Sequence, residues 1–136
     1  MTKKVLAIFS ILVLLLSCIN PAFAAQNPNE IQSDTVFHSI TISLTTSKSA
    51  LFSAYTKYIV GSITVASCWL QKKVGDNWNY VCALPAPTVE SNNTFGYESS
   101  MDYSSYIPSD GNTYRVAARF VADGHHATRY SNQRSF

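Results

Sequence analysis

The sequence predicts an all-β sandwich of about seven short antiparallel strands. Several stretches alternate apolar and polar residues with period two, which is typical of strands that bury one face. Turn-forming residues separate these stretches at fairly regular intervals, and no stretch after the first residues of the chain carries a sustained helical period. Short strands at regular spacing in a chain of this length favour one sandwich domain.

The beginning of the sequence has the form of a secretory signal peptide. Lys3 and Lys4 precede an apolar run from Val5 to Leu16, and Ala22-Phe23-Ala24 supplies small residues for a cleavage site. About a dozen apolar residues span only ~18 Å as a helix, well short of the ~30 Å core of a membrane. We therefore predict a leader over 1–24 and a secreted, extracellular protein.

A second interpretation of the leader stays open. Leu15-Leu16-Ser17-Cys18 resembles a bacterial lipobox, in which the cysteine becomes the lipidated first residue, although Leu16 fits that pattern poorly. Cleavage before Cys18 and a lipid anchor are thus the alternative to cleavage after Ala24. Residues 25–35 are polar and contain Pro28, so we expect a flexible mature N-terminus before a β-sandwich domain over 36–136.

The charge balance argues against nucleic acid as a partner. The chain has 10 Lys and Arg against 8 Asp and Glu, and loss of Lys3 and Lys4 with the leader makes the mature chain formally neutral. Lys72 and Lys73 are neighbours, so on a strand they point to opposite faces and form no basic patch. We expect no nucleic acid and no stable membrane span, and a glycan or protein surface outside the cell as partner.

The first predicted strand covers 36–45, where His38 falls in phase with the apolar residues and is expected to be partly buried. A second strand covers 50–58, with Phe52 and Tyr55 as candidate core residues. Gly61-Ser62 is expected to end it. From Ile63 the apolar phase changes, which predicts either two buried faces or a bulge near Ser67.

Two strands flank a turn at Val74 to Asn77 and each carries a cysteine. Folding about Gly75 places Cys68 opposite Cys82, each seven residues from the pivot, which predicts a cross-strand disulfide. An even pair of cysteines in the mature chain agrees with export. Closing a loop of about 15 residues would stabilise the fold by ~3 kcal/mol.

The rest of the chain supplies further strands. Pro85 ends the return strand of the hairpin, and residues 88–94 are expected to form a loop. Tyr97, Ser99, Met101 and Tyr103 then fall on one strand face. A turn over 107–112, a strongly alternating strand over 114–122, a turn at Asp123-Gly124 and a final strand over 126–134 complete the series.

The segment IPSDGNTYRVAARFVADGHHATRYSN resembles the end of a fibronectin type III or related immunoglobulin-like domain. The resemblance implies an immunoglobulin-like sandwich in which Tyr114 is the corner tyrosine, its hydroxyl bonding to backbone near Pro108 to Asp110. The alternative is that Tyr114 is a core aromatic residue. This chain departs from the pattern because its second strand has Phe52 where such cores usually have tryptophan.

The segment LQKKVGDNW resembles small exported β-sandwich proteins of Gram-positive bacteria that have no assigned activity. Trp69 lies just before this segment and is expected to be structural, as are Tyr114 and Pro108. The resemblance concerns architecture, so it transfers no active-site residues.

No motif predicts catalysis, a metal or a cofactor. His125 and His126 lie beside Asp123, but neighbours on a strand point to opposite faces, so an exposed hairpin is the expectation. Glu98 and Asp102 share a strand face at roughly 13 Å, beyond the spacing of glycosidase carboxylates. We therefore predict that the protein is not an enzyme.

The chain is rich in aromatic residues, with 8 tyrosines and 2 tryptophans. Tyr97, Tyr103 and Tyr106, together with Trp78, are the candidate ligand-binding residues, because exposed rings stack on sugars and protein partners. The alternative is that the rings point inward.

The predicted function is that of a secreted, non-catalytic binding module for a cell-wall or other glycan. The alternative is a small secreted effector, either an inhibitor of an extracellular hydrolase or a toxin-like antimicrobial protein. Such an effector would engage its target through an exposed loop, Asn77 to Tyr80 or Gly124 to Thr128.

Overall fold

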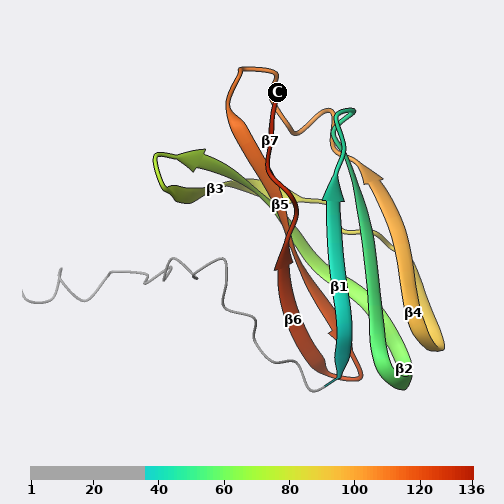
Figure 1. Cartoon of the computed structure of the whole chain (residues 1–136). Coiled ribbons are helices and arrows are strands. Elements are labelled where there is room, and N and C mark those ends of the chain that lie inside the picture. The colour runs from blue at the N-terminus through green and yellow to red at the C-terminus, as the bar shows by residue number, and fades with distance from the viewer. Residues whose placement is uncertain (1–35) are drawn as a thin grey trace, which may run out of the picture.

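The computed structural model describes residues 36–136, which form antiparallel strands and, within this range, no helix. None of these residues therefore belongs to a helix that could cross a membrane. The predicted leader, Cys18 and the predicted flexible segment over 25–35 lie outside the described residues. The strands are β1 (Phe37–Leu44), β2 (Ser49–Val74), β3 (Asn77–Leu84), β4 (Glu90–Asp102), β5 (Thr113–Ala122), β6 (His125–Tyr130) and β7 (Arg134–Ser135) (Figure 1).

The seven strands form one continuous sheet organised on β2, which is 26 residues long. Its first half pairs with β1 and with the second half of β4, and its second half pairs with β5, β3 and the start of β4. β6 and β7 add to β5. The sheet curls into a half-barrel, which differs from the predicted sandwich because β2 and β4 run through both layers.

The bend of β2 explains why the predicted strand end at Gly61-Ser62 is wrong. The backbone N–H groups of Gly61 and Ser62 donate to the carboxylate of Asp123 at 3.1 and 3.2 Å, so the chain changes direction there without leaving the sheet. A Cβ on Gly61 would lie 3.0 Å from Oδ1 of Asp123, so glycine permits this close approach. Two predicted strands are thus halves of β2, and the predicted last strand is divided into β6 and β7.

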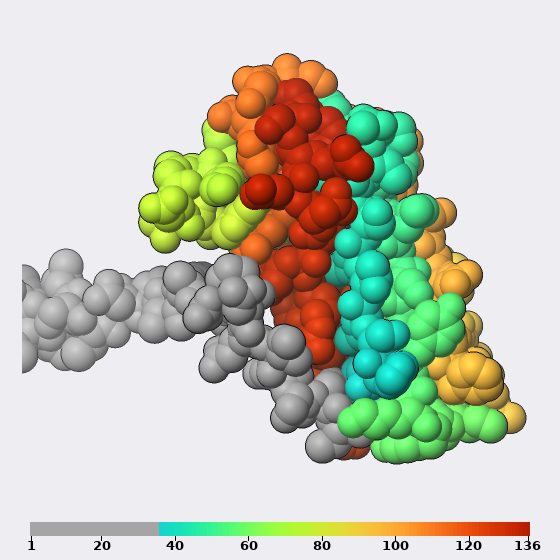
Figure 2. Space-filling model, in the orientation of Figure 1, coloured from blue at the N-terminus to red at the C-terminus, as the bar shows by residue number. Residues whose placement is uncertain are grey.

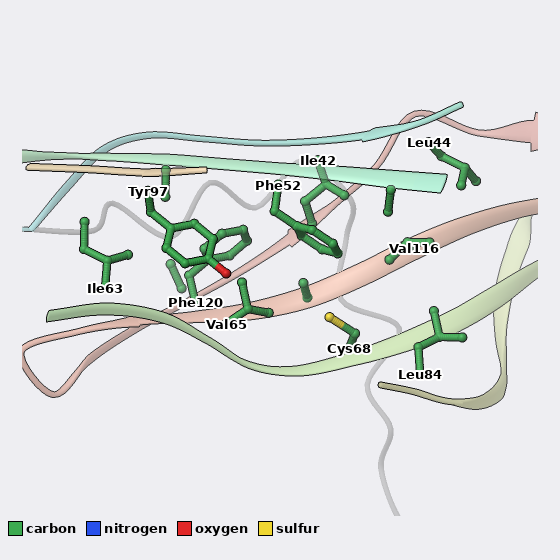
Figure 3. Close-up of a cluster of buried hydrophobic side chains, with 14 of the residues drawn as sticks. Ile42, Leu44, Phe52, Ile63, Val65, Cys68, Leu84, Tyr97, Val116 and Phe120 are labelled. Atoms are coloured by element: carbon green, nitrogen blue, oxygen red, sulfur yellow. The ribbon is translucent and has the colours of Figure 1, made fainter. Parts of the chain in front are cut away.

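The core lies between the two halves of the curled sheet (Figure 3). Phe52 and Tyr97 come from the half that contains β1, and Phe120 comes from the half that contains β5. The ring centroids of Phe52 and Tyr97 each lie 6.3 Å from that of Phe120, with Tyr97 edge-on. Such edge and tilted contacts add to the stabilisation from burial.

A bulge sets which residues of β2 point inward. The β2–β5 register shifts between Val65 and Ser67, which confirms the predicted bulge. Ile63 and Val65 are buried before the shift, and Cys68 and Leu70 are buried after it. Because the extra residue reverses the phase, Trp69 lies on the outer face of the sheet.

Three local predictions, for His38, Tyr55 and residues 88–94, are wrong. His38 is exposed, since the β1–β2 register shifts between Phe37 and Ser39. Tyr55 points outward, where its ring covers Gly96 and its hydroxyl donates to Glu98 at 2.9 Å. The predicted loop over 88–94 is largely strand, because β4 begins at Glu90.

An asparagine side chain connects the two ends of the half-barrel. The N–H of Leu44 donates to Oδ1 of Asn132 at 2.8 Å, and Nδ2 of Asn132 donates to the carbonyl of Leu44 at 3.1 Å. Nε of Arg134 donates to the same carbonyl. The side chains of Asn132 and Arg134 thus bond the N–H and carbonyl of Leu44, which point away from β2.

Candidate functional site on the outer face of the sheet

The three tyrosines predicted to bind a ligand, Tyr97, Tyr103 and Tyr106, do not form an exposed surface. Tyr97 and Tyr103 are fully buried, and only Tyr106 of the three is exposed, with its ring edge-on to Tyr103 at 6.3 Å. The hydroxyl of Tyr103 donates to the carbonyl of Pro85 at 2.8 Å. Burial raises the pKa of both Tyr97 and Tyr103. These two rings build the core, so they cannot stack on a ligand.

The two cysteines are free thiols, and the predicted disulfide is absent. Cys68 pairs with Leu84, and Cys82 pairs with Leu70. The turn is centred between Gly75 and Asp76, because Val74 pairs with Asn77, and not on Gly75 as predicted. A bulge between Leu70 and Gln71 then shifts the pairing by one more residue. The cysteines are therefore diagonal neighbours, with Cα atoms ~7–8 Å apart, whereas a disulfide needs less than ~6.8 Å. Burial raises the pKa of Cys68 to about 11.

The three predicted structural residues have different environments. Tyr114 is buried, and its hydroxyl donates to the Asp110 side chain at 2.8 Å rather than to backbone. It therefore combines both predicted roles, as a core aromatic residue and as the residue that secures the turn before β5. Pro108 is exposed, and Trp69 is partly exposed on the outer face.

The structure brings together an aromatic cluster on the outer face that the sequence did not predict as a unit. Its members come from four neighbouring strands in the order β3, β2, β5 and β6. We call it the outer cluster: Trp69, Gln71, Trp78, Tyr80, Arg115 and Tyr130. Both tryptophans of the chain therefore lie outside the core.

Arg115 is the centre of the outer cluster. Its guanidinium carbon lies 4.3 Å from the ring centroid of Trp78 and 4.0 Å from that of Tyr130. Nε of Arg115 donates to Oε1 of Gln71 at 2.7 Å. Burial lowers the pKa of Arg115, although it remains a cation because its ordinary pKa is above 12. The guanidinium thus holds aromatic rings of two distant strands in one surface by cation–π contacts.

The outer cluster leaves aromatic surface accessible to a ligand. Trp69, Trp78 and Tyr130 are partly exposed, and Tyr80 has 61% of its surface exposed. Trp69 pairs across the sheet with Ala83 and Ala117, whose small side chains do not cover it. Aromatic rings beside a guanidinium and an amide can stack on a sugar ring and hydrogen-bond its hydroxyls.

The β2–β3 hairpin carries part of this cluster and stands out from the body of the protein (Figures 1 and 2). Gly75, at its turn, has φ +61°, a conformation that glycine adopts without strain. Val74, Tyr80 and Val81 are exposed on the hairpin. Trp78, one of the four residues predicted to bind a ligand, therefore lies on this projecting hairpin, which we call the hairpin arm.

Among residues 36–136, no group of three or more His, Cys, Asp or Glu could hold a metal ion. His125 and His126 are both exposed, as the hairpin interpretation predicts. The Cys68 thiol is buried and its raised pKa keeps it protonated, so it is not an activated nucleophile.

Arg115, Tyr130 and Gln71 are the site residues that sequence reasoning missed. The alternation of Arg115 with buried apolar residues shows which face of β5 it occupies. Its neighbours could not be assigned, because bulges decide the facing of β2 and β3. No family model, curated protein or solved structure matches this chain.

Proposed function

We propose that this chain is an exported, non-catalytic binding module whose outer cluster binds an extracellular glycan. The observation that carries the proposal is the position of both tryptophans and of Tyr80 on the solvent-facing side of the sheet. A tryptophan exposed at the surface loses the stabilisation that it would gain in the core, so its placement there favours a role in recognition. The leader and the likeness of LQKKVGDNW to exported proteins support an extracellular partner.

The contacts of Arg115 support a preformed site. The guanidinium already lies against Trp78 and Tyr130, and Nε is already bonded to Gln71. A ligand that stacks on these rings therefore need not order them, which removes an entropic cost of binding. The formally neutral mature chain agrees with a neutral sugar better than with a polyanion.

Intrinsic fluorescence tests this proposal directly, because both tryptophans lie in the outer cluster. We expect soluble fragments of the bound polysaccharide to quench or shift the tryptophan emission. We also expect the purified protein to co-sediment saturably with cell wall or insoluble polysaccharide. Tyr80→Ala should weaken this binding about tenfold without lowering stability, because the ring is exposed and its loss removes stacking alone.

The control for this experiment is Tyr106→Ala, which removes an exposed tyrosine that does not belong to the outer cluster. It should bind like the wild-type protein. Retention that both variants reduce equally, or no retention of the wild-type protein on any polysaccharide, would contradict the proposal.

A second candidate function is that of a secreted effector that contacts a protein target through the β2–β3 hairpin. The projecting β2–β3 hairpin (Figure 2) favours it, because it carries the exposed side chains of Val74, Tyr80 and Val81. Such a loop can enter the cleft of an extracellular hydrolase. Inhibition of secreted hydrolases or of bacterial growth, lost in Val74→Ser/Val81→Ser and present without glycan binding, would favour the effector.

A further inference from the structure

A second accessible surface lies where β2 and β4 bend, at the end of the molecule away from the C-terminus (Figure 1). Residues 56–59 of β2 lie opposite Phe95 of β4, because Tyr55 pairs with Gly96 and Val60 pairs with Thr94. The extra residues push apolar side chains out of the sheet.

Three of these side chains form a protruding apolar surface that we call the bend patch: Tyr58, Ile59 and Phe95. Their exposed fractions are 54%, 62% and 59%. Nothing in the core requires them to be apolar, since they point away from it. Large exposed apolar groups gathered at one place mark a surface that meets another molecule.

Local groups bond several peptide groups of the bend. The N–H of Lys57 donates to the carbonyl of Val36 at 3.0 Å, and the hydroxyl of Thr56 donates to the carbonyl of Tyr58 at 2.7 Å. Across from them, the side chain of Thr94 accepts from the N–H of Gly96 at 3.1 Å and donates to its carbonyl at 3.2 Å. The Asp123 carboxylate accepts from the N–H groups of Gly61 and Ser62.

These bonds matter because peptide groups at an exposed bend can otherwise bond to water. In an apolar medium, each unsatisfied peptide group costs several kcal/mol, so a segment that enters lipid must satisfy its backbone internally. The bend therefore combines exposed apolar side chains with several peptide groups that are already bonded within the protein.

The charges around the bend patch also suit a lipid surface. The segments 56–62 and 91–97 contain no Asp or Glu, and Lys57 is exposed beside the patch. Glu98, the next carboxylate along β4, accepts a hydrogen bond from the hydroxyl of Tyr55 at 2.9 Å. Asp123, the carboxylate that caps the bend, is already bonded to two N–H groups. A lysine beside apolar residues can extend to lipid phosphates while its stem stays in the interface.

The size of the bend patch argues against a protein partner. Three side chains of this exposure offer roughly 300 Å² of surface, whereas a stable protein interface buries ~800 Å² on each partner. A small protruding surface is sufficient for the boundary between headgroups and acyl chains, where tyrosine and phenylalanine are favoured. We propose that the bend patch inserts into the interface of an anionic lipid bilayer, independently of the glycan site on the outer cluster.

Flotation of the protein without the predicted leader, residues 25–136, with lipid vesicles tests the proposal, because the apolar run of the leader would itself bind lipid. The wild-type protein should partition onto phosphatidylcholine vesicles that contain a quarter phosphatidylglycerol, and less onto phosphatidylcholine alone. Tyr58→Ser/Ile59→Ser/Phe95→Ser should lower the partition coefficient about tenfold or more, because three apolar groups no longer leave water. Lys57→Gln should lower it about threefold, and only on the anionic vesicles.

The matched control is Val74→Ser/Val81→Ser, which removes exposed apolar residues of the hairpin arm that do not belong to the outer cluster and should leave the partition unchanged. Should the triple variant not fold, Ile59→Trp provides a second measurement, since its emission should shift to shorter wavelength on the anionic vesicles. No partition of the wild-type protein, or equal loss in the triple variant and the control, would overturn the proposal. Concentration-dependent dimerisation abolished by the triple variant would also overturn it. Glycan retention tests the outer cluster separately.

Discussion

At the scale of single residues, Tyr114 secures the turn before β5 through Asp110. The side chain and backbone N–H of Asn112 and the hydroxyl of Tyr114 lower the pKa of Asp110 to about 2. A carboxyl whose pKa falls on folding stabilises the fold above its unfolded pKa of ~3.9. That stabilisation is lost as the pH falls from ~4 to about 2.

Tyr114→Phe removes one of these bonds from a buried ring. We expect the free energy of unfolding at neutral pH to fall by about 1 kcal/mol. The loss of stability between pH 4 and pH 2 should become smaller, because the pKa of Asp110 lies closer to its ordinary value. Urea unfolding at several pH values measures both effects, with Tyr106→Phe as an exposed control. Identical unfolding curves for Tyr114→Phe and the wild-type protein would contradict this role.

The cysteines differ in their accessibility to reagents. Cys68 is buried and its pKa is raised to about 11, whereas Cys82 is partly exposed. Iodoacetamide at pH 8 should therefore modify Cys82 in the native protein and Cys68 only after unfolding, as peptide mass spectrometry can show. A reducing agent should leave the melting temperature unchanged. A Cys68–Cys82 crosslinked peptide would show instead that the chain forms a disulfide.

The raised pKa of Cys68 also predicts a dependence of stability on alkaline pH. The folded state holds the thiol proton more tightly than the unfolded state, whose thiol has a pKa of ~8.5. The stabilisation is complete below that value and is lost as the pH rises towards about 11. Cys68→Ala should reduce this dependence.

At the scale of elements, Asp123 holds the bend of β2 in place. It has φ +46°, in the left-handed region that Asn and Asp tolerate better than other residues, and it precedes Gly124 in the β5–β6 turn. Asp123→Ala loses both bonds to the bend and strains the turn, so we expect about 2 kcal/mol lower stability. Asp123→Asn should cost less, since it keeps an acceptor and the turn conformation.

Amide hydrogen exchange distinguishes this local role from a general loss of stability. Asp123→Ala should speed the exchange of Gly61 and Ser62 more than that of core residues such as Val116. Uniformly faster exchange throughout the sheet would contradict the assignment of Asp123 to the bend.

The hairpin arm is held to the body by Arg115. Arg115→Lys keeps the charge but removes the planar group that contacts Trp78 and Tyr130, and lysine does not reproduce the bond from Nε to Gln71. We expect about 1–2 kcal/mol lower stability and a red-shifted tryptophan emission, because Trp78 becomes more exposed. Unchanged emission in Arg115→Lys would show that the guanidinium does not order the outer cluster.

At the scale of the whole molecule, the half-barrel depends on the link between β1 and the C-terminal segment. Asn132→Ala removes a donor and an acceptor that satisfy the backbone of Leu44, so we expect about 1–2 kcal/mol lower stability and faster exchange of the Leu44 amide. Gln133→Ala, at an exposed neighbouring position, should have no effect. An unchanged Leu44 exchange rate in Asn132→Ala would contradict a closing role.

The sequence alone predicted the all-β class, the approximate number of strands and most strand positions. Alternation and turn chemistry are local properties, and β1, β3 and β5 follow them closely. The burial of Phe52 was also predictable, as was the inward face that Tyr97 of β4 shares with Tyr103 just after that strand, because alternate residues of an extended chain share a face.

The tertiary structure alone decided how these strands pair and which side chains meet. A single extra residue reverses the facing of everything after it, so the bulges of β2 and the position of the β2–β3 turn moved Cys68 away from Cys82 and Trp69 out of the core. From its neighbours in sequence, Gly61 is expected to end a strand. In the structure it lies at a bend within β2, because its N–H donates to Asp123, which is distant in the sequence. The outer cluster and the bend patch both depend on such pairings between residues far apart in the chain, which no local pattern encodes.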